Sequence, residues 1–174
     1  MAAPHESSSG LAIDRVDRAL HTLSVWSNAF ESGGVIPEIH SAYGGKQSPD
    51  LEWEVTPPDA VSIAIVMEDP GAPWVHWVLY NIPARISRLP ECLPADAHLE
   101  NLGGALHGNH GGGEAGYFGP MPPRGDGVHH YHFEVFALDA VPDLPAGATR
   151  DALVAAMKGH VLACGELVGT YTAE

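Results

Sequence analysis

Basic side chains are scarce in this sequence. Its 174 residues include 8 Lys and Arg against 22 Asp and Glu, which gives a formal net charge of -14 with histidine counted as neutral. Such an acidic surface repels the phosphate backbone of nucleic acids and the anionic surface of membranes, so we expect neither a nucleic acid nor a stable membrane association. A small anion held in a local pocket is still compatible with this charge.

Cysteines and long apolar runs are scarce as well. The two cysteines, Cys92 and Cys164, lack a metal-binding spacing such as C-x-x-C. No run approaches the ~20 apolar residues that a membrane-spanning helix needs. The first residues have neither the basic start nor the apolar stretch of a signal peptide. We therefore predict a cytoplasmic protein with free thiols.

Common catalytic and metal-binding motifs are also missing. The sequence contains no G-x-S-x-G, no P-loop and no G-x-G-x-x-G, so no motif indicates an activated serine or a nucleotide. The histidine pairs 107/110 and 130/132 could each form half of a metal site. No Cys, Asp or Glu accompanies them at a recognised spacing, and we therefore predict no metal site.

Short apolar segments separated by proline-containing turns make up most of the chain. Residues 61–67 form a near-continuous apolar run, typical of a strand buried on both faces, whereas residues 51–55 and 128–138 alternate like strands with one buried face. Residues 150–161 have the one strong helical pattern, with Thr149 as a possible N-cap. Many short strands and one late helix predict a mostly β fold of the sandwich type.

The length of the chain suggests one domain. We predict that residues 1–22 form a flexible or partly helical N-terminal segment, because residues 1–10 are small and polar and residues 11–23 have roughly helical apolar spacing. Residues 23–174 would then form a single domain.

Three polar residues stand out as a candidate site. Asp69, His76 and His129 each lie where a proline-stiffened loop meets an apolar strand. Asp69 could orient a histidine and raise its pKa, so that the imidazolium binds an anion or passes a proton. The alternative is that Asp69 caps a turn and His76 is a buried, hydrogen-bonded core residue. Spacing alone leaves both interpretations open.

Three motif regions occur in an order that resembles one known family. They are S-P-D-L-E-W at residues 48–53, D-P-G-A-P at 69–73 with His76-Trp77 after it, and G-P-M-P-P-R-G at 119–125 followed by V-H-H-Y at 128–131. They are similar to the S-P-x-L-x-W, D-P-D-A-P, G-x-x-P-P-x-G and H-R-Y motifs of the phosphatidylethanolamine-binding protein family. The resemblance covers roughly residues 23–171.

The resemblance implies a two-sheet Greek-key β-sandwich with a C-terminal helix, one or two short helices and a small anion pocket at one end. It implies no metal and no organic cofactor, a cis Ala72–Pro73 bond, and a homodimer as a plausible assembly. Both pocket histidines would donate to the anion, and Tyr131 would supply a hydroxyl. The positions that match ligand-binding residues of the family are Asp69, Ala72, Pro73, His76, Met121, Pro123, His129 and Tyr131.

The sequence also departs from the family pattern. Gly71 stands where the family has a second acid, the loop from Pro73 to His76 is short, and His130 replaces an arginine with a titratable ring. The Gly- and His-rich segment 103–116 is atypical as well. These differences put the family's ordinary ligand in doubt.

Three functions follow from these observations. The first is a binding protein for a small anionic or phosphorylated ligand. The second is a cofactor-independent enzyme, such as a cyclase, isomerase or lyase, in which His76, His129 and Asp69 perform acid–base catalysis on a small metabolite. The third is an interaction module that inhibits a protease or kinase.

Overall fold

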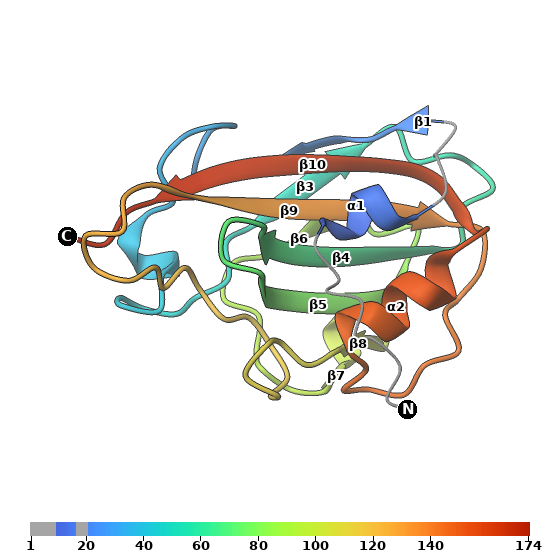
Figure 1. Cartoon of the computed structure of the whole chain (residues 1–174). Helices are drawn as coiled ribbons and strands as arrows, with labels where there is room; N and C mark the ends of the chain where they lie inside the picture. Colours follow the sequence, from blue (N-terminus) through green and yellow to red (C-terminus); the bar gives the residue numbers. More distant parts are fainter. Residues whose placement is uncertain (1–9, 17–20) are drawn as a thin grey trace, which may run out of the picture.

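Two β-sheets form the body of the protein (Figure 1). The computed structural model describes residues 10–16 and 21–174. The larger sheet has the strand order β1 (His21–Thr22), β10 (Val161–Tyr171), β9 (His129–Leu138), β4 (Ser62–Asp69), β5 (Trp74–Pro83), β8 (Ala105–His107) and β7 (His98–Leu99). The smaller sheet has the order β2 (Ser24–Trp26), β3 (Leu51–Glu54) and β6 (Arg88–Leu89). Among these pairs only β1 and β10 run parallel.

The main hydrophobic core lies between the two sheets. Trp53 from β3 packs in the same buried cluster as Trp77 from β5 and Phe133 from β9. Strand β4 lies between β9 and β5, and all eight of its residues are buried. This arrangement confirms the predicted mostly β, two-sheet fold, because apolar runs become central strands and alternating runs supply one core-facing side.

Helices cover the other face of the larger sheet. Helix α2 (Arg150–Met157) and the one-turn helix α1 (Ala12–Arg15) pack there against a second apolar cluster that includes Val66, Tyr80 and Phe136 (Figure 1). Two 3-10 turns, η1 (Glu38–His40) and η2 (Glu100–Leu102), lie in connecting loops. None of the helices among the described residues is long and apolar enough to cross a membrane.

Two predicted element boundaries are wrong. The helix predicted over residues 150–161 ends at Met157, because Gly159 adopts a left-handed φ of 79° and Val161 already begins β10. Its predicted N-cap is confirmed, since the Thr149 side chain accepts a hydrogen bond from the Ala152 amide. The apolar pattern also placed the end of β4 at residue 67, whereas the strand continues to Asp69.

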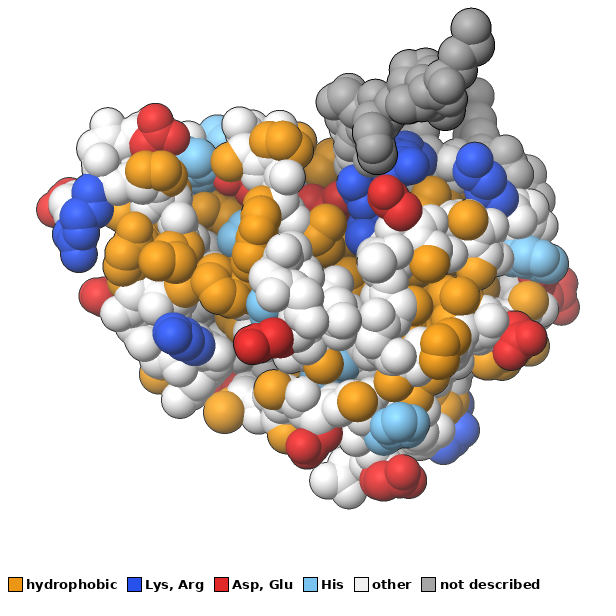
Figure 2. Space-filling view, turned by 60° about the horizontal axis from the view of Figure 1, so that its bottom comes forward, with side chains coloured by type: hydrophobic (Ala, Val, Ile, Leu, Met, Phe, Trp, Pro, Cys, Tyr) orange, Lys and Arg blue, Asp and Glu red, His pale blue; other side chains and the backbone are white. Residues whose placement is uncertain are grey.

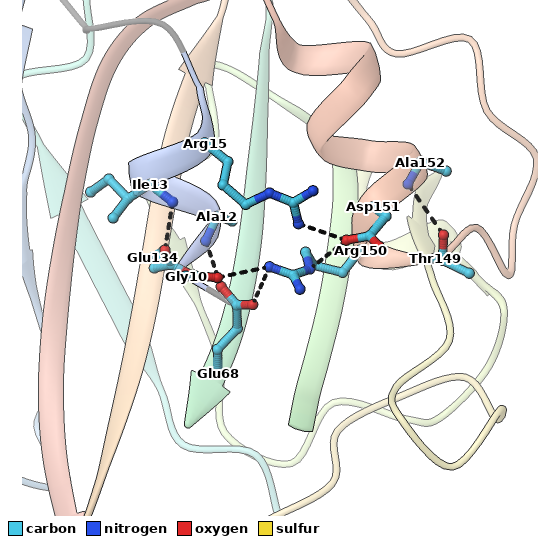
Figure 3. A network of polar contacts seen from close by, with 10 residues as sticks. All are labelled: Gly10, Ala12, Ile13, Arg15, Glu68, Glu134, Thr149, Arg150, Asp151 and Ala152. Carbon is cyan, nitrogen blue, oxygen red and sulfur yellow. Dashed lines mark hydrogen bonds and ion pairs between the residues drawn. The ribbon is translucent and has the colours of Figure 1, made fainter. Parts of the chain in front are cut away.

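Strand β4 extends because Glu68 has buried partners (Figure 3). The Ala12 amide donates to Glu68 Oε2 at 2.7 Å, and Arg150 Nη1 lies 2.8 Å from Glu68 Oε1. The Ile13 amide donates to Glu134 Oε1 at 2.7 Å. Residues 10–16 therefore tie the N-terminal segment to two carboxyl groups on the sheet. The predicted flexibility of residues 1–9 and 17–20 lies outside the described residues.

Candidate ligand-binding site

A cavity of about 290 Å³ opens at the end of the larger sheet where β4 ends and β5 and β9 begin. This end of the sheet is on the left in Figure 1. Figure 2 shows hydrophobic and histidine side chains close together on the left part of one face. Seven of the eight residues that match the family's pocket positions line the cavity, and Pro73 is not among them. The lining residues are Asp69, Ala72, Trp74, His76, Phe118, Met121, Pro122, Pro123, His129 and Tyr131.

Asp69 performs both tasks that the sequence left open. Its Oδ1 accepts hydrogen bonds from the amides of Gly71 at 2.8 Å and Ala72 at 3.3 Å, which caps the turn between β4 and β5. Its Oδ2 lies 2.6 Å from Nδ1 of His129. Asp69 is 3% exposed, so both contacts are shielded from water. The turn thus fixes the carboxylate that orients His129.

His129 is held between two carboxylates. Besides the contact with Asp69, its Nε2 lies 2.9 Å from Oδ2 of Asp126. A neutral imidazole can donate through one nitrogen only, so two carboxylate acceptors favour the doubly protonated imidazolium. The hydrogen bond that His129 donates to Asp69 is the main cause that raises the pKa of His129, with Asp126 acting in the same direction and burial opposing them. Both carboxylate contacts therefore favour the positively charged form of the ring.

His76 has the opposite character. Its Nδ1 lies 2.9 Å from the carbonyl oxygen of Phe118 and donates to it, which leaves Nε2 as an acceptor. Burial lowers the pKa of His76, and the ring is therefore neutral near neutral pH. The resemblance implied that both histidines donate to an anion, but in this arrangement His76 offers a lone pair instead. The core-residue interpretation of His76 also holds, since the side chain is buried and hydrogen-bonded.

Tyr131 lies between the two histidines. Its ring meets His76 edge-on at 5.1 Å between centroids and stacks near His129 at 6.5 Å. Burial is the main cause that raises the pKa of the Tyr131 hydroxyl, and the negative charge of Asp69 adds to it. The hydroxyl stays protonated and can donate or accept a hydrogen bond in the cavity.

An aromatic wall completes the cavity, and sequence reasoning missed it. Trp74 lies 4.8 Å from His76, 4.7 Å from Phe118 and 5.5 Å from His110, measured between ring centroids. Part of the Gly- and His-rich segment 103–116, from His110 to Gly112, passes against this indole. A Cβ atom on Gly111 would lie 2.6 Å from the Trp74 ring, which explains why the segment passes here with a glycine. Trp74 falls between Pro73 and His76, so its position beside the site was available in the sequence.

The cis bond predicted between Ala72 and Pro73 is wrong. No peptide bond is cis within residues 10–16 and 21–174. X-Pro bonds prefer the trans form by about 0.5–1 kcal/mol. Here the two amides that donate to Asp69 close the turn with a trans bond.

His107 and His132, one from each histidine pair considered for metal binding, have other partners. His107 is buried, and its Nδ1 donates to the Asp96 carbonyl while Nε2 accepts from the Trp77 indole. His132 pairs with Glu166 at 2.9 Å, and His130 is exposed. Across the described part of the chain, no group of three or more His, Cys, Asp or Glu side chains is arranged to hold a metal ion.

Comparisons with known proteins agree with the motifs. The family model described as phosphatidylethanolamine-binding protein matches residues 26–172. The chain belongs to the phosphatidylethanolamine-binding protein family. A UPF0098 protein of Pyrococcus abyssi is 40% identical over 148 residues, which cover 83% of this chain and 83% of that relative.

Solved structures of the phosphatidylethanolamine-binding protein family share the fold. A homologue from Chlamydia trachomatis has a TM-score of 0.78 at 34% identity, covering 88% of this chain and 99% of that one. Escherichia coli YbcL has a TM-score of 0.77 at 29% identity, covering 87% of this chain and 99% of YbcL. The resemblance drawn from the motifs is thus confirmed, and family membership supports a ligand-binding protein in general.

Proposed function

We propose that this protein binds a small anionic or phosphorylated ligand that also has an apolar part. The observation that carries the proposal is that His129, held between two carboxylates, lies on the lining of a mostly apolar cavity. An imidazolium attracts an anion most strongly where water is excluded, because the local dielectric is low. The anion would pair with His129, and the apolar part would lie against Trp74 and Phe118.

The remaining polar groups fit the same ligand. The Tyr131 hydroxyl can donate to an oxygen of the anion, and neutral His76 can accept from a hydroxyl or an amine on the ligand. Ligand sites are usually apolar clefts with a few polar groups that set orientation, and cavities of about 300–1,000 Å³ are typical. At about 290 Å³, this cavity suits a small molecule.

Acid–base catalysis is the second candidate. It is favoured by one specific observation, namely that the pKa of His129 is raised while that of His76 is lowered in the same cavity. Two titratable groups pushed in opposite directions can serve as a general acid and a general base. In this function His129, oriented by Asp69, would donate a proton, and His76 would accept one from a small metabolite.

A calorimetric titration at pH 6.5 and constant ionic strength tests the proposal. The probes are inorganic phosphate and phenyl phosphate, and the variants are His129→Gln and, as a control, His98→Gln, which changes an exposed histidine on β7. Wild type and His98→Gln should bind both probes, phenyl phosphate more tightly because its ring buries apolar surface against Trp74. His129→Gln should lose at least tenfold in affinity for both, since a charge-assisted hydrogen bond is worth about 1.5–3 kcal/mol.

The outcomes separate the candidates. Equal binding by wild type and His129→Gln would contradict the role of the imidazolium. If folded wild type binds neither probe, the anion proposal fails, and neutral metabolites should then be screened for turnover as the acid–base function predicts.

A further inference from the structure

We propose that Asp126 is a specificity-determining residue of this pocket, because its carboxylate occupies the ring nitrogen of His129 that an anionic ligand needs. The inference rests on the proposed anion-binding function. A ligand anion and the Asp126 carboxylate would compete for Nε2 of His129. Asp126 therefore determines how tightly, or at what concentration, an anion must bind in order to occupy this nitrogen.

The competition follows from the geometry of His129. Its Nδ1 is committed to the buried Asp69, whose carboxylate is also held by the turn amides. Nε2 is therefore the donor at which an exchange can occur. Asp126 occupies it at 2.9 Å, but the Asp126 side chain is 57% exposed, whereas that of Asp69 is 4% exposed. A water-exposed carboxylate is the partner that a ligand can displace at little cost.

The loop that carries Asp126 allows its side chain to leave without unfolding. Gly125 and Gly127, with φ of 79° and 89°, set the backbone direction on both sides. The Gly125 amide donates to the Ala173 carbonyl, and the Asp126 amide donates to the Pro123 carbonyl. These bonds fix the loop backbone, so displacement requires only a rotation of the Asp126 side chain about its own bonds.

A second cavity lies next to the contact. It measures about 460 Å³ and is lined by Asp126, His130 and His132, and it shares Asp69 and His129 with the aromatic cavity. The pair of Asp126 and His129 therefore stands at the boundary between an aromatic cavity and a polar one. The charged group of a ligand that replaces Asp126 would therefore face the polar cavity.

The charge balance explains why the competition matters. Asp69, His129 and Asp126 together carry one positive and two negative charges when Asp126 is in contact, so an incoming anion meets a net negative site. Asp126 is three residues from His129 on a loop whose backbone is fixed, so its carboxylate stays within reach of Nε2 after it leaves. A weakly binding anion such as a free carboxylate must displace this permanent competitor before it occupies His129.

The experiment uses Asp126→Asn, which keeps the side-chain size and removes the charge. The control is Glu114→Gln, which removes one charge from an exposed residue of the loop that carries His110 and makes no contact with His129. Inorganic phosphate and acetate are titrated into each protein at pH 6.5 and constant ionic strength. Asp126→Asn should bind both anions about fivefold more tightly than wild type, the upper range for an exposed ion pair. Glu114→Gln should match wild type.

A second measurement tests the contact without any ligand. The titration of His129 is followed by NMR in wild type and Asp126→Asn, and the pKa of His129 should fall in the variant. Unchanged titration, or anion affinity equal to or weaker than wild type in Asp126→Asn, overturns the inference but leaves the proposed function standing. If neither wild type nor Asp126→Asn binds any anion while both are folded, the proposed function fails, and the inference fails with it.

Discussion

Glu134 should make the stability of this protein depend on pH in an unusual direction. Its side chain is fully buried on β9, and it faces Glu68. Burial is the main cause that raises the pKa of Glu134 well above its ordinary value of 4.5, and the hydrogen bond and charge of Glu68 add to it. A carboxyl group that is buried beside a second carboxylate is favoured in its neutral, protonated form. The folded protein therefore holds a proton that the unfolded chain releases.

The sign and size of the effect follow from proton linkage. Above pH 4.5 the unfolded chain loses the Glu134 proton while the folded protein keeps it, so stability falls as pH rises. One retained proton gives a slope of about 1.4 kcal/mol per pH unit between the unfolded and the folded pKa. Above the folded pKa this contribution stops changing.

Glu134→Gln should remove that slope. The amide oxygen can still accept from the Ile13 amide (Figure 3), and the neutral amide stands in for the protonated carboxyl beside Glu68. The free energies of unfolding of wild type and the variant are measured by urea titration from pH 5 to pH 8. As pH rises, the free energy of unfolding of the variant should increase relative to that of wild type by about 1.4 kcal/mol per pH unit, until the pKa of Glu134 in the folded protein is reached. Glu91→Gln, at an exposed position, serves as the control and should follow wild type. A difference between wild type and Glu134→Gln that does not change with pH would refute the reasoning.

Three further changes test other parts of the structure. Tyr80→Phe removes the hydroxyl that donates to the Pro145 carbonyl and accepts from the Ala148 amide. It should lower the free energy of unfolding by about 1–3 kcal/mol in urea titration, and an unchanged value would contradict these hydrogen bonds. Thr149→Ala removes the N-cap of α2 and should cost about 1 kcal/mol by the same assay, whereas Thr149→Ser should be near neutral. Asp69→Asn should lower the pKa of His129 in an NMR titration. A raised histidine pKa stabilises the fold below about pH 6.5, and this stabilisation is lost as pH rises through the folded pKa. The free energies of unfolding of wild type and Asp69→Asn should therefore differ less at high pH than at low pH. A difference that is the same at every pH would contradict the pairing of Asp69 with His129.

Much of the fold could be predicted because burial on one or both faces leaves a direct pattern in the sequence. The run at residues 61–67 became the central strand β4, and residues 129–138 became β9. The extension of β4 through Glu68 could not be predicted, because it depends on Arg150 and on the Ala12 amide far away in the chain. The burial of Glu134 could not be predicted for the same reason, because its partner is the Ile13 amide of α1, 121 residues away.

The site was predicted in part for a similar reason. The sequence could predict that Asp69 and His76 lie at the same end of the sheet, because adjacent antiparallel strands end and begin at the same edge. Which histidine Asp69 contacts depends on side-chain direction across strands, and the partner proved to be His129, 60 residues away. Trp74 lies between two matched positions and could have been expected beside the site, whereas Asp126 matched no motif that the resemblance supplied, so its place came from the structure alone.

The charge state of His129 is the most direct test of the account. Nitrogen-15 NMR of the two pocket histidines at pH 7 reports which ring nitrogens are protonated, before and after addition of inorganic phosphate. We predict that His129 is protonated on both nitrogens and shifts when phosphate is added, while His76 stays neutral with its proton on Nδ1. A neutral His129 at pH 7, or a charged His129 whose resonances do not respond to phosphate, would contradict the central claim that this imidazolium is the anion-binding group.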